Sequence, residues 1–155
     1  MVEPSELRHA LTECWSAEVS GVAYYEALAE RFPAHQHEFG VLALVEKTMR
    51  DLIETVARRY DVSIDHDTAE HVGVDVARLG NDWREVLENA LSYTPETLRM
   101  YENLANVLPA DDAAVGDAVV EHERAQIVLF ETVAADKPED WSAIDAFLER
   151  HGARR

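Results

Sequence analysis

Apolar residues recur at spacings of three and four along four long segments of this chain, with polar residues between them. This spacing predicts helices that each bury one face. Pro33 and Pro109 end the first and third helices, because proline cannot continue a helix. The connections that follow these prolines are short. We therefore expect the first and second helices, and the third and fourth, to be antiparallel neighbours.

The same two-helix pattern occurs twice in the sequence. EKTMRDLIETVA (residues 46–57) and ERAQIVLFETVA (residues 123–134) share their first acid and their last four residues. YYEALAERFP (residues 24–33) matches MYENLANVLP (residues 100–109) at Tyr, Glu, Leu, Ala and Pro in register. A duplicated pair of helices makes four. The two halves cover about residues 6–60 and 82–135.

Two irregularities interrupt this helical pattern. Residues 61–81 show no sustained periodicity and are long enough to run the length of a bundle, so we expect the second and third helices to be parallel. Pro95 predicts a kink or break in the third helix, since it removes one hydrogen bond and clashes with the preceding turn. Thr94 would then be the N-cap of the part that follows.

A short fifth helix is expected at residues 139–151. Trp141, Ile144 and Leu148 share one stripe, and Gly152 is its stop signal. We expect this helix to seal one end of the bundle. Residues 1–155 are long enough for one well-buried core and too short for two, which predicts a single domain. The fold class is therefore all-α, an antiparallel four-helix bundle with one long crossover and a short C-terminal helix.

The charge of the chain limits its partners. Asp and Glu number 31 against 14 Lys and Arg, for a formal net charge of −17. The resulting field repels phosphate backbones and anionic lipid headgroups, so we expect neither nucleic-acid nor membrane binding. The acidic surface fits high solubility, and it also fits a saline cytoplasm in which salt screens the repulsion. The sequence leaves both interpretations open.

Cysteine content and hydropathy indicate the compartment. The single cysteine, Cys14, excludes an internal disulfide framework, fits a reducing environment and is interpreted as a small buried side chain. No apolar run approaches about 18 residues, and the acidic start MVEPSEL is unlike a signal peptide. We therefore expect a cytoplasmic protein.

Three glutamates lie on faces that the apolar pattern assigns to the core. With an advance of about 100° per residue, Glu46 falls in the stripe that contains Leu42 and Met49. Glu18 and Glu123 fall within the apolar stripes of their own helices. An unpartnered buried carboxylate is costly, so three of them in one interior require compensation. A divalent cation is one partner that provides it.

Other side chains near these glutamates have alternative interpretations. His122 lies about 60° from the centre of its apolar stripe, and is either a nitrogen ligand or a half-buried histidine bonded to a neighbouring helix. Arg50 follows Glu46 by one helical turn and can form an internal ion pair with it, so we expect Glu46 to be held by Arg50 or by a side chain from another helix. Tyr25 and Tyr101 occupy equivalent positions of the repeat and either bond the inward carboxylates or pack as ordinary core residues.

The order of the elements, the long crossover, the E-x-x-x-x-x-x-Y-E pattern from Glu18 to Glu26, and the inward Glu46 and Glu123 resemble the ferritin-like superfamily. Within it, the chain is similar to rubrerythrin-type di-iron carboxylate proteins over about residues 6–135. The resemblance implies a ferritin-like bundle with Glu18, Glu46 and Glu123 as metal ligands on the first, second and fourth helices.

The chain departs from this family pattern at three ligand positions. Met49 and Gln126 stand where the family has a histidine three residues after Glu46 and Glu123, and Thr94 stands at the position of the third-helix glutamate. A thioether and an amide are poor ligands for an iron pair that activates oxygen. The chain also lacks the Cys-x-x-Cys pairs of a rubredoxin-like module, which excludes a complete rubrerythrin.

Three functional hypotheses remain. The lost ligands favour the first, a ferritin-like protein with an incomplete di-iron site and a metal-poor binding or structural role. The second is a metalloprotein or oxidoreductase that handles iron or another divalent cation through Glu18, Glu46 and Glu123, with His122 or water completing the site. The third is an assembly module. We expect a homodimer, no competent di-iron oxidase, and either no cofactor or one divalent metal ion.

Overall fold

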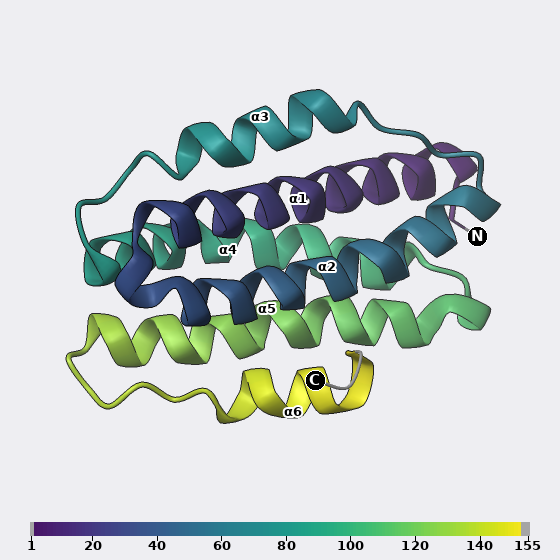
Figure 1. The fold of residues 1–155 in the computed structure, drawn as a ribbon. Coiled ribbons are helices and arrows are strands. Elements are labelled where there is room, and N and C mark those ends of the chain that lie inside the picture. Colours follow the sequence, from purple (N-terminus) through teal and green to yellow (C-terminus); the bar gives the residue numbers. More distant parts are fainter. Residues whose placement is uncertain (1, 153–155) are drawn as a thin grey trace.

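The computed structural model describes residues 2–152, which contain six α-helices and two short 3-10 turns (Figure 1). Four helices are long: α1 (Pro4–Arg31), α2 (Gln36–Arg59), α4 (Trp83–Val107) and α5 (Ala113–Ala134). Two are short: α3 (His66–Val76) and α6 (Ser142–His151). The turns η1 (Pro33–His35) and η2 (Ala110–Asp112) directly precede α2 and α5. No β-strand occurs in the described residues, so the all-α prediction is confirmed.

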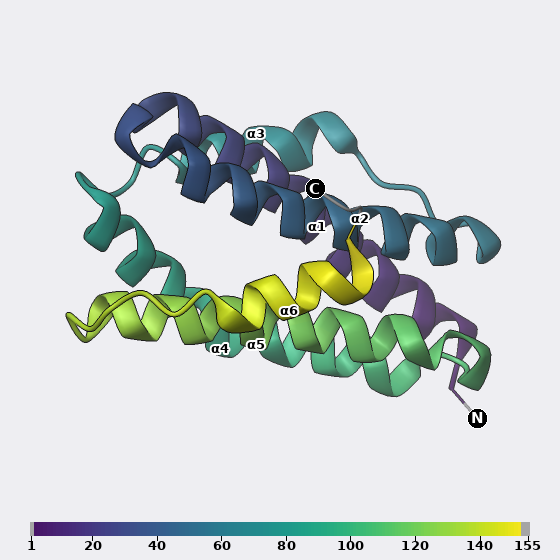
Figure 2. The ribbon, with the colours of Figure 1, turned by 60° about the horizontal axis from the view of Figure 1, so that its bottom comes forward.

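The long helices form two antiparallel pairs (Figures 1 and 2). One pair is α1 with α2, the other is α4 with α5, and the pairs meet through contacts of α1 with α4 and of α2 with α5. Helices α2 and α4 begin at the same end, where the Phe39 and Trp83 rings lie 5.1 Å apart, and run in the same direction. The segment between them therefore returns along the length of the helices, as expected for the crossover (Figure 1).

A cluster of buried hydrophobic side chains fills the space between the helices, and all six helices contribute to it. Members with no exposed surface include Leu28, Phe39, Leu104, Leu129 and Ile144. These residues lie on the stripes predicted from the apolar spacing, so burial of apolar area is what joins the helices. Within residues 2–152, no helix is long and apolar enough to cross a membrane.

The crossover contains a helix that the sequence pattern did not predict. Helix α3 begins at Asp65, whose carboxylate accepts a hydrogen bond from the Thr68 backbone N–H at 3.0 Å, as an N-cap does. It packs on α1 through Ala69 and Gly73, the only residues of α3 that are buried. A Cβ at Gly73 would lie 2.1 Å from the Ser20 carbonyl oxygen, so glycine permits the close approach. Because its two buried residues are small, the α3 sequence shows no apolar periodicity of the kind that predicts a helix.

Helix α4 passes through Pro95 without a break, so a break there and the N-cap at Thr94 are wrong, and the kink stays a prediction. Proline has no N–H and would leave the Leu91 carbonyl, one turn earlier, without its helical partner. The Thr94 hydroxyl donates to that carbonyl at 2.7 Å. The side chain thus replaces the hydrogen bond that Pro95 removes, and the helix continues to Val107.

Helix α6 confirms the predicted short C-terminal helix but not its position. It buries Ile144, Phe147 and Leu148 against α5 and α2, and lies along the side of the long helices instead of sealing an end (Figures 1 and 2). Trp141 precedes its first turn. Gly152 ends the helix as expected, with its N–H donating to the Leu148 carbonyl at 2.8 Å.

Candidate metal centre

The three glutamates predicted to face the core are buried there. Glu18 on α1 has no exposed surface, while Glu46 on α2 is 5% exposed and Glu123 on α5 is 7% exposed. Each occupies the apolar stripe of its helix, so the helical position alone carries the carboxylate inward. The prediction of three inward acids from three helices is confirmed.

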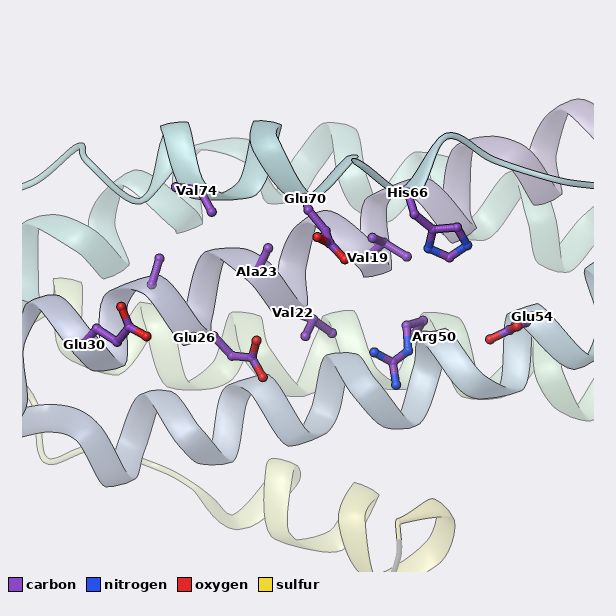
Figure 3. A pocket seen from close by; sticks show the side chains of 11 residues that line it. Val19, Val22, Ala23, Glu26, Glu30, Arg50, Glu54, His66, Glu70 and Val74 are labelled. Carbon is purple, nitrogen blue, oxygen red and sulfur yellow. The ribbon is translucent and has the colours of Figure 1, made fainter. Parts of the chain in front are cut away.

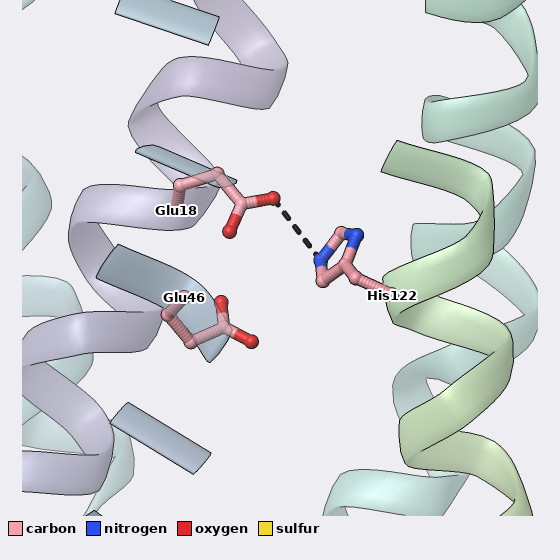
Figure 4. Close-up of side chains that lie close together, drawn as sticks. All are labelled: Glu18, Glu46 and His122. Carbon is pink, nitrogen blue, oxygen red and sulfur yellow. Dashed lines mark ion pairs between the residues drawn. The ribbon is translucent and has the colours of Figure 1, made fainter. Parts of the chain in front are cut away.

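His122 reaches the same interior from α5. It is fully buried, so the alternative of a half-buried histidine is wrong. Its Nε2 lies 3.2 Å from Glu18 Oε1, and both Glu18 and Glu46 point toward it (Figure 4). One ligand atom from each of Glu18, Glu46 and His122 lies within 4.8 Å of the other two. The Tyr101 ring packs edge-on against the imidazole, with centroids 4.8 Å apart, and limits its rotation.

The hydrogen bond on the other side of His122 fixes its tautomer. Nδ1 lies 2.5 Å from the Val119 carbonyl oxygen, which can only accept, so Nδ1 carries the hydrogen. In a neutral imidazole the Nε2 lone pair then faces the Glu18 carboxylate. Within residues 2–152, neither oxygen of Glu18, nor His122 Nε2, has a hydrogen-bond partner. Two acceptors that face each other repel unless a proton or a cation lies between them.

Glu46 is held by Gln126. The Gln126 amide nitrogen donates to Glu46 Oε1 at 2.5 Å, and its carbonyl oxygen accepts from the Tyr25 hydroxyl at 2.7 Å. All three residues are buried. Gly21 on α1 makes room for the carboxylate, because a Cβ there would lie 2.2 Å from Glu46 Oε2. Sequence reasoning missed Gly21, although a glycine inside a helix is a signal of close packing.

Of the two expected partners of Glu46, the side chain from another helix is found in Gln126, whereas Arg50 forms no ion pair with Glu46. The Arg50 guanidinium bonds Asp51 at 2.9 Å and lines a surface cavity of about 500 Å³ beside Glu26 and Glu70 (Figure 3). Arg50 lies near the edge of the apolar stripe of its helix, so its side chain could point either to the core or to the surface. Its long side chain extends toward water. No group of ligand residues among residues 2–152 meets metal-site geometry in this surface cavity.

Burial makes the interior carboxyls weak acids. It raises the pKa of Glu18 to about 7 and that of Glu123 to about 8. The pKa of Glu46 is raised well above its usual range, first by burial and then by the nearby Glu18 carboxylate. The nearby Tyr101 hydroxyl lowers the pKa of Glu18 and so offsets a part of this increase. The hydroxyl does not meet the geometry of a full hydrogen bond to Glu18. A cation among these groups would oppose all three increases.

The positions where the family resemblance implies further ligands are committed to other contacts. Met49 is fully buried in the hydrophobic core. The Thr94 hydroxyl bonds the Leu91 carbonyl, and the Gln126 amide bonds Glu46. Glu123 is buried, but it is not part of the group formed by Glu18, Glu46 and His122. The interior thus brings together three residues that could hold a metal ion.

Comparison of the chain with protein families, with curated proteins and with solved structures finds no match. The chemistry of the interior residues therefore carries the functional argument.

Proposed function

We propose that this protein is a ferritin-like, rubrerythrin-related bundle with an incomplete di-iron site, and that it binds one divalent metal ion through Glu18, Glu46 and His122. The observation that carries the proposal is the set of unpartnered atoms at the centre of the helices. Both Glu18 oxygens and His122 Nε2 are buried without hydrogen bonds, within reach of Glu46. Buried polar atoms without partners are costly, and a cation would satisfy all of them together.

The donor set suits a transition-metal ion. Two carboxylates and one imidazole are ligands that Fe²⁺, Mn²⁺ and Zn²⁺ accept. Bonds of about 2.1 Å hold ligand atoms no more than about 4.2 Å apart, so small side-chain rotations would bring the three donors into range. The Val119 carbonyl already orients His122 through Nδ1–H, which is the usual outer support of a metal-bound histidine. The Gln126 amide orients Glu46 in the same way.

A second ion does not fit. The Gln126 amide nitrogen donates a hydrogen bond to Glu46. It therefore occupies the position on this carboxylate that a second cation would need. A second ion requires imidazole and carboxylate ligands at positions 49 and 94. Met49 offers a buried thioether there, and the Thr94 hydroxyl is already hydrogen-bonded to the Leu91 carbonyl. We therefore propose that the chain does not oxidise iron as a two-metal enzyme does.

The test is a titration of chelator-treated protein with Mn²⁺, Zn²⁺ and Co²⁺ by calorimetry. We expect one ion per chain, with the affinity reduced by about 10- to 100-fold or more in Glu18→Gln and His122→Gln. Glu30→Gln, which removes an exposed carboxylate from the same helix, is the matched control and should bind as the wild type does. Equal affinity in Glu18→Gln and in Glu30→Gln would contradict the assigned ligands.

Anaerobic addition of Fe²⁺ followed by oxygen tests the incomplete site. We expect at most one iron per chain and an oxidation rate equal to that of buffer. Two bound irons with rapid oxidation would replace this proposal with a di-iron enzyme. The absence of binding by every ion would favour a metal-free structural core, in which the proton held by Glu18, with its pKa of about 7, separates the facing acceptors.

A further inference from the structure

A second interior space lies beside the metal centre. It is a cavity of about 450 Å³ that passes between α1, α3 and α4 and has Glu46 and Glu123 among its lining residues. Val72 and Tyr93, on α3 and α4, also line it and are 52% and 54% exposed. The cavity thus joins an apolar entrance to an acidic interior, at a size typical of small-molecule sites.

Glu123 is the unexplained group of this cavity. Its side chain is more than nine-tenths buried, and no hydrogen bond or ion pair to it occurs among residues 2–152. Glu46 by contrast accepts a hydrogen bond from the Gln126 amide, and Glu18 belongs to the group with His122 in the proposed metal centre. Burial without a polar partner favours the protonated form of Glu123, and an occupant of the cavity that carries a positive charge would stabilise its carboxylate form.

We propose that this cavity binds a small organic ammonium ion, with its –NH₃⁺ group on the Glu123 carboxylate and its apolar part toward Val72 and Tyr93. An ammonium donates charge-assisted hydrogen bonds to a carboxylate. The rings of Tyr24, Tyr93 and Phe130 line the space and offer apolar surface to the hydrocarbon part of the ligand. The net charge of −17 attracts organic cations and repels organic anions.

The ammonium site goes beyond the proposed metal function, because it uses a carboxylate that the metal centre leaves over. Glu123 is absent from the group of Glu18, Glu46 and His122. A metal ion alone would also leave the apolar entrance unexplained, whereas an amine with a hydrocarbon body contacts both ends of the cavity.

The experiment is calorimetric titration of the full chain, held in excess chelator, with benzylammonium chloride at about pH 8.5, above the pKa of about 8 of Glu123, so that the carboxylate form is present. Because no metal ion is present, the outcome is independent of the proposed metal function. We expect one benzylammonium per chain, with benzyl alcohol and benzoate at least about tenfold weaker. Glu123→Gln should weaken the amine at least about tenfold, while Glu131→Gln, an exposed acid on the same helix, should not.

A second variant tests the same site without altering the acid. Ala90 lines the cavity from α4, so Ala90→Phe should fill the entrance and abolish benzylammonium binding while thermal unfolding stays cooperative. Three results would each overturn the proposal: benzyl alcohol binding as tightly as the amine, wild-type affinity in Glu123→Gln or in Ala90→Phe, or no amine binding by the wild type at millimolar concentration.

Discussion

Replacing Glu18 by glutamine should change how the stability of the metal-free protein depends on pH. The wild-type carboxyl is fully buried, and its pKa is raised from 4.5 to about 7, chiefly by burial. The folded protein therefore holds this proton more tightly than the unfolded chain does. The resulting stabilisation is complete below about pH 4.5 and is lost as the pH rises through about 7. A glutamine at position 18 has no proton to lose, so its contribution is constant.

The size of the effect follows from these two pKa values. Between pH 5.5 and pH 8, deprotonation of Glu18 should lower the free energy of unfolding by about 2 kcal/mol. The other ionisable groups, including Glu46, Glu123 and His122 around the site, are common to both proteins. The difference between wild type and Glu18→Gln therefore isolates the Glu18 term and its coupling to these neighbours.

Urea unfolding in chelator, followed by tryptophan fluorescence, to which the buried Trp15 contributes, measures this difference at each pH. We expect the wild type to lose its advantage over Glu18→Gln progressively between pH 5.5 and pH 8. The difference between wild type and Glu30→Gln should stay constant, because Glu30 is exposed. Parallel pH profiles for wild type and Glu18→Gln would refute the argument that burial raises this pKa. Saturating Zn²⁺ should restore stability at pH 8, since the ion binds the deprotonated carboxylate.

Two further predictions concern single contacts, and a third concerns the positions of the missing ligands. Gly21→Ala should weaken Zn²⁺ binding at least about tenfold, because its Cβ would displace Glu46, whereas Gly40→Ala, with open space around it, should bind as the wild type does in calorimetry. Thr94→Val should cost about 1–2 kcal/mol in urea unfolding, because it leaves the Leu91 carbonyl unpartnered; Thr97→Val should cost less, because its carbonyl partner at Tyr93 keeps a backbone donor. The triple variant Met49→His, Thr94→Glu, Gln126→His should raise iron content from at most one toward two per chain, and an unchanged content would show that these positions do not limit binding.

The helical pattern predicted which residues meet in the core, because apolar spacing is a property of each helix alone. Glu18, Glu46 and Glu123 could be placed inward by their angles, and the structure buries all three. The repeat likewise predicted two helical pairs, since neighbours joined by short connections have to be antiparallel.

The partners of these residues depend on contacts between helices, which one helix cannot specify. Gln126, not Arg50, bonds Glu46, because the bundle brings α5 opposite α2 while the Arg50 side chain extends to the surface. Helix α3 escaped detection because it packs through the small residues Ala69 and Gly73. The predicted break at Pro95 is wrong because the Thr94 side chain replaces the backbone hydrogen bond that proline removes.

The Thr94 hydroxyl, which replaces the hydrogen bond lost at Pro95, also distinguishes the two halves of the repeat. Glu18 and Thr94 occupy equivalent positions of the repeat, so a two-fold symmetric ancestor would have carried the same residue at both. Here Glu18 faces the imidazole of His122, while the Thr94 hydroxyl donates a hydrogen bond to the backbone of its own helix. If the halves arose by duplication, the different contacts let the two positions be selected independently. In an alignment of relatives, we expect position 94 to covary with 95, and position 18 with 122, in place of 18 with 94.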